Sequence, residues 1–118
     1  MENKNIHLNQ IAKHVKKYAN VISSVMKVDV EIVDQDLIRI AGTGIFSKKI
    51  GVKATGCVYK DVLKTGKSHI INEPGKDKLC ILCSEKNRCR ETLEISTPIF
   101  HFDSIIGVIG LVCFTDIQ

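Results

Sequence analysis

The longest apolar stretch of the chain reads Ile105-Ile106-Gly107-Val108-Ile109-Gly110-Leu111-Val112-Cys113-Phe114. It is about half as long as the roughly 20 residues that a membrane-spanning helix needs. Apolar side chains occupy both alternating sets of positions, so a strand formed by this stretch would be buried on both faces. The stretch therefore predicts a central strand of a sheet. Cys113, which lies between Val112 and Phe114, is predicted to be a core residue and not a ligand.

Four further segments have the alternation or the composition of β-strands, and turns separate the members of each hairpin. They are Val28–Ile32, Leu37–Ala41, Ser68–Ile71 and Ile95–Phe100. Pro98 predicts a bulge or an edge position in the last of them, because proline cannot donate a hydrogen bond to a neighbouring strand.

The N-terminal part of the chain carries apolar residues at alternating steps of three and four, which is the spacing of a helical stripe. They are Leu8, Ile11, Val15, Tyr18, Ile22 and Val25. We therefore expect a helix within residues 1–27. So narrow a stripe suits packing on the helix's own domain and pairing with a second copy about equally, and both arrangements stay open. We expect a homodimer through this helix.

A second, shorter helix is predicted over Cys57–Thr65, where apolar side chains recur at i, i+4 spacing, with Gly66 placed to end it. The order of helix, two strands, helix and three strands predicts an α+β domain. In this fold one antiparallel five-stranded sheet carries the N-terminal helix and short helices. A chain of 118 residues forms one such domain, 1–118, and buries roughly two-thirds of its unfolded surface.

Charge and composition exclude several classes of function. The net charge is +4, the chain has no Trp, and the basic residues are scattered, so a nucleic-acid-binding surface is not expected. The first residues are polar and do not form a signal peptide, which favours a cytoplasmic protein without a membrane segment. No nucleophile, base and acid stand out as a set, so we do not expect an enzyme.

Three of the five cysteines lie in one polar segment with the spacing C-x2-C-x5-C. They are Cys80, Cys83 and Cys89, in a loop expected over residues 72–93. Basic residues, among them Lys86 and Arg88, outnumber acidic ones around them. Nearby cations favour the thiolate, which is the form of cysteine that binds metals and reacts with oxidants. The segment therefore predicts a metal or redox site.

Cys57 is the best candidate for a fourth ligand, because it begins a helix whose positive end also favours a thiolate. Structural zinc sites usually use two C-x2-C pairs, and the second pair is absent here. Three loop cysteines with a remote fourth are closer to iron–sulfur ligation. We predict a [4Fe-4S] cluster on Cys80, Cys83, Cys89 and Cys57, with zinc or a thiol/disulfide switch as the alternatives.

From about residue 28 to its end, the chain resembles the N-terminal sensory domain of sigma-54-dependent transcriptional regulators of anaerobic bacteria. These domains are PAS/GAF-like modules that precede an AAA+ ATPase and a Fis-type helix-turn-helix. The segments that carry the resemblance are Val62–Lys67, the three loop cysteines, Glu94–Ile99 and Ile105–Leu111. The last segment is common in GAF domains generally, and its combination with the cysteine loop is more specific.

The resemblance implies a signal-sensing module that is often dimeric and has no catalysis of its own. It also implies AAA+ ATPase and DNA-binding domains in the full-length protein. One departure is Ser96, because such relatives are expected to carry a further cysteine close before the Pro-Ile pair. The motif therefore supports the three loop cysteines more firmly than Cys57. A small-molecule-binding GAF domain with a structural zinc site is the alternative function, and a pocket between sheet and helices would support it.

Overall fold

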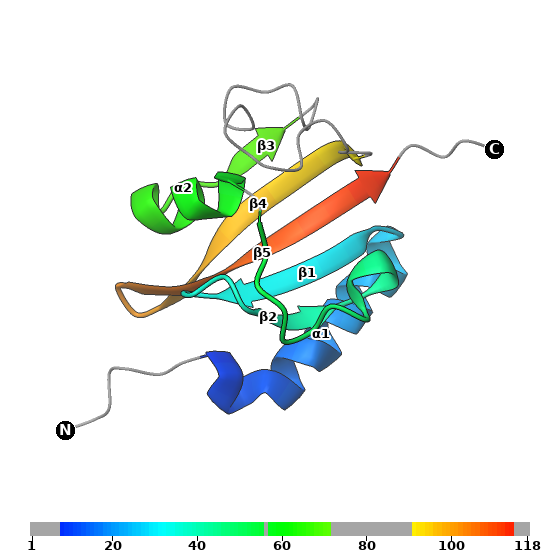
Figure 1. Cartoon of the computed structure of the whole chain (residues 1–118), viewed down its shortest axis with the longest axis horizontal. Coiled ribbons are helices and arrows are strands. Elements are labelled where there is room, and N and C mark those ends of the chain that lie inside the picture. The colour runs from blue at the N-terminus through cyan, green and yellow to red at the C-terminus, as the bar shows by residue number, and fades with distance from the viewer. Residues whose placement is uncertain (1–7, 56, 72–90, 115–118) are drawn as a thin grey trace.

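The computed structural model describes residues 8–55, 57–71 and 91–114 (Figure 1). Within these ranges the elements follow in the order η1 Leu8–Ile11, α1 Ala12–Met26, β1 Asp29–Asp34, β2 Arg39–Gly42, η2 Gly44–Phe46, α2 Cys57–Thr65, β3 His69–Ile71, β4 Glu91–His101 and β5 Ser104–Phe114. The second helix has its predicted bounds. The last part of the predicted cysteine loop belongs to β4, and residues 72–90 lie outside the described residues.

The strands form one antiparallel sheet in the order β2-β1-β5-β4-β3 (Figure 1). β5, the apolar stretch quoted first, lies in the middle and pairs with β1 on one side and β4 on the other. The predicted central position of this strand is therefore confirmed, as is the α+β class with a five-stranded antiparallel sheet.

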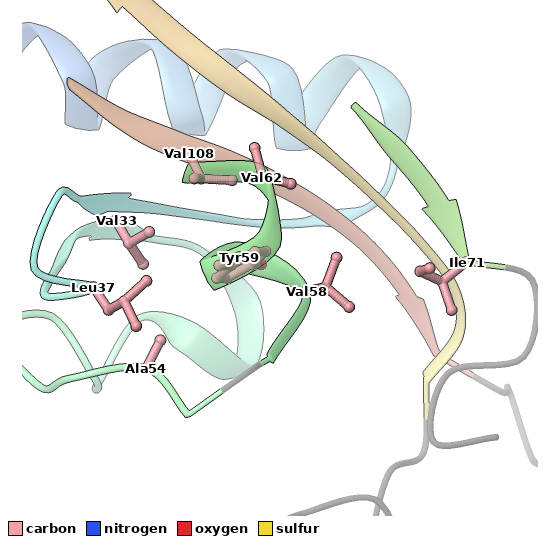
Figure 2. Packing of buried hydrophobic residues seen from close by; sticks show 8 residues of the cluster. All are labelled: Val33, Leu37, Ala54, Val58, Tyr59, Val62, Ile71 and Val108. Carbon is pink, nitrogen blue, oxygen red and sulfur yellow. The ribbon is translucent and has the colours of Figure 1, made fainter. Parts of the chain in front are cut away.

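The two helices lie on opposite faces of the sheet (Figure 1). α1 packs on β1 and β2, and α2 packs over β4 and β5. The core beneath α2 contains Val33, Leu37, Ala54, Val58, Tyr59, Val62, Ile71 and Val108 (Figure 2). The core beneath α1 contains Leu8, Val15, Ala19, Val30, Ile32, Ile40, Ala41 and Ile106. Both faces of β1 and β5 are thus used, which explains the apolar residues on both faces of β5.

Two residues singled out in the sequence behave as predicted. Gly66 has a φ of +73° and its N–H donates to the Val62 carbonyl oxygen at 2.8 Å, which ends α2. Pro98 pairs with Val108 of β5, and β3 pairs with β4 only as far as Ser96. No described strand therefore needs an N–H group from Pro98 on the β3 side. The pairing of β4 and β5 also shifts register one residue later, as a bulge does.

The apolar stripe of α1 is divided between two sides of the helix, which corrects the prediction of a single seam. Leu8 and Val15 are 1% and 8% exposed and pack on the sheet, whereas Tyr18 and Val25 are 60% and 74% exposed. The buried side is centred on Ala19. Ala19 does not belong to the predicted stripe, so the face of the helix that packs on the sheet is rotated away from the outer apolar residues.

Cys113 is half-buried and is not enclosed in the core, which corrects a second prediction. Its neighbour Val112 is buried on the face that α2 covers. Because side chains alternate along a strand, Cys113 lies on the other face, where α1 packs on β1 and β2. Within the described part of the chain, no helix is long and apolar enough to cross a membrane.

Candidate functional site

The four predicted thiol ligands fall in two parts of the chain. Cys57 is the first residue of α2. Cys80, Cys83 and Cys89 belong to the segment between β3 and β4 and lie outside the described residues. The described elements that flank this segment are β3, which precedes it, and β4, which follows it.

The segment leaves the sheet beside the first turn of α2, because α2 and β3 lie side by side in opposite directions. Nε2 of His69 in β3 lies 2.6 Å from Oδ2 of Asp61 in α2. Ile71, two residues further along β3, shares one buried cluster with Val58, which lies almost one turn earlier in α2 (Figure 2). The chain thus departs from Ile71 near the turn that Cys57 begins.

The predicted ligand set takes one thiol from α2 and three from the segment. The N-terminal end of a helix carries partial positive charge, which in general favours the thiolate of a cysteine in the first turn. Thiolates are soft ligands that suit iron–sulfur clusters and zinc. Among the described residues, no group of three or more His, Cys, Asp or Glu side chains is placed to hold a metal ion. A metal site at this end of the sheet would therefore take most of its ligands from the segment.

A buried polar network lies under α2, and the sequence did not predict it. Glu31 of β1 is 6% exposed. Its Oε1 accepts a hydrogen bond from Nε of Arg39 at 2.6 Å, and its Oε2 accepts one from the Tyr59 hydroxyl at 2.7 Å. Nη1 of Arg39 also donates to the carbonyl oxygens of Val52 and Lys53, at 3.3 and 3.4 Å. The network joins α2, β1, β2 and the segment that leads to α2.

Polar side chains continue from this network across the sheet in one row. Cross-strand pairing places Glu31 opposite Gly110, Gly110 opposite Ser96, and Ser96 opposite His69. Ser96 is fully buried, and its hydroxyl donates to Oε2 of Glu94 at 2.8 Å. Directly opposite residues of an antiparallel pair share a face, so the row runs from β1 to β3 on the α2 side.

Gly110 makes room for Tyr59 in the middle of this row. A Cβ atom at position 110 would overlap the Tyr59 hydroxyl. A glycine inside a strand often marks such a close approach. It lets the tyrosine ring lie against β5 while its hydroxyl reaches Glu31.

The alternation in β1 explains why the network was missed. Asp29 and Glu31 alternate with Val30 and Ile32, which predicts that the acidic residues face solvent. Alternation assigns residues to two faces, and it does not say whether a helix covers the polar face. The signal that could have revealed the network is the pair Glu31 and Arg39, opposite charges on adjacent strands of one hairpin.

The sequence is similar to that of a bacterial regulator. It is 35% identical over 113 residues to UacR of Escherichia coli (strain K12), described as a uric acid sigma-54-dependent transcriptional regulator. The match covers 94% of this chain and 19% of that protein, so the chain spans about a fifth of the relative's length. No protein-family model matches the chain.

Solved GAF domains share the fold. The GAF domain of an Acinetobacter phosphoenolpyruvate-protein phosphotransferase superposes with a TM-score of 0.70 at 16% identity, covering 98% of this chain and 74% of that one. The A. aeolicus nlh2 GAF domain in an inactive state gives 0.67 at 17% identity, covering 89% and 69%. The cofactor-binding GAF domain of the nutrient sensor CodY from Clostridium difficile gives 0.64 at 16% identity, covering 86% and 69%.

At these identities the structural likeness concerns the fold alone, and the sequence match supplies the relationship to a regulator. Both agree with the resemblance that the sequence motifs indicate. The chain has the fold of solved GAF domains, and over nearly its whole length it is similar to part of a sigma-54-dependent transcriptional regulator.

Proposed function

We propose that this domain is the regulatory, signal-sensing module of a sigma-54-dependent transcriptional regulator and has no catalysis of its own. The match to such a regulator over 94% of the chain supports this role. In the full-length protein, AAA+ ATPase and DNA-binding domains would act on the signal that this domain receives.

The proposed signal is redox state or oxygen, sensed by a [4Fe-4S] cluster on Cys80, Cys83, Cys89 and Cys57. The supporting observation is that Cys57 begins α2 and that the next residue, Val58, shares a buried cluster with Ile71, the last residue of β3. A cluster on thiolates supplies an oxidisable, oxygen-sensitive group. If Cys57 and the three loop cysteines all bound the cluster, the segment would be tied to α2, because metal binding and ordering of the chain are linked.

The buried network gives a physical route from α2 to the other face of the sheet. Tyr59 lies two residues after Cys57 and is hydrogen-bonded to Glu31 of β1. The next residue of β1, Ile32, packs in the core beneath α1. A shift of α2 on gain or loss of the cluster would therefore be passed through β1 to α1.

The test is anaerobic purification of the chain, followed by an absorption spectrum and analysis of iron, sulfide and zinc. We expect iron, labile sulfide and a broad visible absorption that air bleaches. Cys57→Ser should lower iron retention, and the matched control Cys113→Ser should not. Protein that stays colourless after reconstitution with iron and sulfide, yet binds one zinc tightly, would show that the cysteines form a zinc site instead.

A second candidate function is binding of a small polar molecule on the α2 side of the sheet. The buried row of Glu31, Tyr59, Ser96 and Glu94 favours it, because most buried surface in a domain of this size is apolar. The similar regulator is named for uric acid, a planar molecule with several hydrogen-bond donors and acceptors. Such a molecule would exchange hydrogen bonds with the network and displace part of α2.

Calorimetry with uric acid separates this candidate from the first. Binding that Tyr59→Phe weakens and that Cys57→Ser leaves unchanged would assign the sensing role to the network. Heat of binding that neither substitution alters would place the ligand elsewhere.

We also propose that the domain functions as a homodimer through α1. The structure divides the predicted stripe, and it leaves Ile11, Tyr18, Val21 and Val25 exposed on the outer side of the helix. These positions follow one another at steps of seven, three and four, and apolar residues so spaced along one exposed helix face are typical of a helix that packs against a partner. Light scattering that finds the wild-type chain monomeric at all accessible concentrations would exclude this dimer.

A further inference from the structure

The segment that follows β2 forms a well-anchored loop beside that edge strand. Residues 44–53, here called the basic loop, contain η2 and the stretch after it. The N–H of Gly51 donates to the Arg39 carbonyl oxygen at 2.8 Å, and the N–H of Arg39 donates to the Val52 carbonyl oxygen at 3.2 Å. Phe46 is buried, and the guanidinium carbon of Arg39 lies 5.8 Å from the centroid of its ring. The loop therefore has a defined conformation and its own buried anchor.

Three aliphatic side chains of the basic loop face solvent. Ile45, Ile50 and Val52 are 52%, 40% and 54% exposed, and they belong to neither of the two cores described above. Single exposed apolar residues are ordinary on a protein surface, whereas several gathered in one place mark an interaction site. Their grouping in one short, anchored loop therefore calls for a partner.

The charged residues of the basic loop are all cationic. They are Lys48, Lys49 and Lys53, and all three are exposed. The sequence contains no acidic residue between Asp36 and Asp61. Within the described ranges, none of the three lysines forms an ion pair. Their charge is therefore available to a partner.

Acidic residues of the neighbouring strand β1 are already engaged. Oδ2 of Asp29 accepts a hydrogen bond from the N–H of Ile45 at 3.4 Å, and a Cβ atom at Gly44 would overlap the same carboxylate. Glu31 is buried and bonded to Arg39. The carboxylates of β1 thus hold the backbone of the loop and the inside of the domain, and the lysine side chains stay unpaired.

Protection of the sheet edge explains only part of this surface. Lysines beside an edge strand discourage pairing with another chain. Exposed isoleucine and valine have the opposite effect, because burying them favours association. A loop that served only to protect the edge would carry the lysines without the aliphatic residues. The combination suits a partner that offers negative charge and apolar surface together.

We propose that the basic loop is a docking surface for a segment of another protein that carries acidic and aliphatic side chains. The carboxylates of that segment pair with the three lysines, and its aliphatic side chains pack against those of the loop. Charge complementarity selects an acidic partner over a neutral one. Since the loop is already held by hydrogen bonds, docking costs little additional ordering. The proposal is independent of the cluster, the small-molecule ligand and the homodimer.

The side chains of the basic loop favour a protein over a nucleic acid or a membrane. Single-stranded nucleic acids are bound by cations together with aromatic side chains on which bases stack. Membrane interfaces are enriched in tryptophan and tyrosine. The one aromatic residue of the loop is Phe46, which is buried. Aliphatic side chains between lysines suit a protein surface of matching shape and charge.

Fluorescence anisotropy with two short labelled peptides tests the proposal. One peptide alternates glutamate with leucine, and the other alternates glutamate with serine. The first should bind, and the second should bind at least ~10-fold more weakly because it lacks the apolar contacts. No binding of the first peptide, or equal binding of both, would overturn the proposal. Binding to vesicles of phosphatidylcholine and phosphatidylserine without binding to the first peptide would also overturn it and assign the loop to a membrane.

Substitutions locate the binding on the loop. Lys48→Gln combined with Lys49→Gln should weaken binding of the first peptide at least ~10-fold, and so should Val52→Ser. Lys60→Gln combined with Lys64→Gln removes two exposed lysines from α2 and should leave binding unchanged. Circular dichroism checks that each variant is folded. Equal weakening by both lysine pairs would show attraction to the net charge of the domain and would overturn the proposal.

Discussion

The Tyr59 hydroxyl donates a 2.7 Å hydrogen bond to Oε2 of Glu31, so one buried polar contact ties α2 to β1. Apolar contacts alone would allow a helix to slide on a sheet at low cost. A hydrogen bond to a carboxylate is stronger than one between neutral groups and more sensitive to position, so it fixes α2 along the sheet. Because Cys57 precedes Tyr59 by two residues, the same contact positions the first turn of α2.

Tyr59→Phe should lower the free energy of unfolding by about 1–3 kcal/mol, because Oε2 of Glu31 stays buried without that donor. Urea denaturation measures the change. Tyr18→Phe is the matched control, since the Tyr18 ring is 60% exposed and its hydroxyl is predicted to contribute less than about 0.5 kcal/mol. Equal losses in the two variants would contradict a special role for the Tyr59 hydrogen bond.

Arg39→Ala should be more damaging, at about 3–5 kcal/mol of unfolding free energy, because it leaves the buried Glu31 carboxylate without its ion-pair partner. Replacing both partners, with Glu31→Leu and Arg39→Met, should recover part of that loss since no buried charge remains. Thermal unfolding of the single and double variants checks the order. A double variant less stable than Arg39→Ala would contradict it.

Gly110→Ala should destabilise the domain by about 1–3 kcal/mol, because the added methyl group overlaps the Tyr59 hydroxyl. Combining it with Tyr59→Phe removes the overlapping oxygen. The sum of the two single losses of unfolding free energy should therefore exceed the loss measured for the double variant. The four proteins of this cycle are compared by urea denaturation. Strictly additive losses would show that the methyl group added at position 110 is accommodated without touching Tyr59.

Alkylation should divide the cysteines by their response to metal. Bound metal or cluster should suppress modification of Cys57 together with Cys80, Cys83 and Cys89. Cys113 is half-buried in β5, and its modification rate should not depend on metal. Mass spectrometry of timed samples gives the rate at each site. Cys57 reacting at one rate with and without metal would remove it from the ligand set.

Several features could be predicted from the sequence because they depend on neighbours along the chain. The continuous apolar residues of β5 indicate burial on both faces, and the i, i+4 spacing with Gly66 gives α2 its bounds. The C-x2-C-x5-C spacing singles out the loop thiols as candidate ligands, and that candidate set stays a prediction.

The tertiary structure alone decided which faces are covered. Periodicity placed Glu31 on the polar face of β1, and only the packing of α2 over that face made it a buried partner of Arg39 and Tyr59. Likewise, the spacing placed the apolar residues of α1 in one stripe, and only the packing of Val15 and Ala19 on the sheet showed that Tyr18 and Val25 lie outside the contact. The physical reason is that periodicity reports which side chains share a face, whereas burial depends on contacts between segments far apart in the sequence.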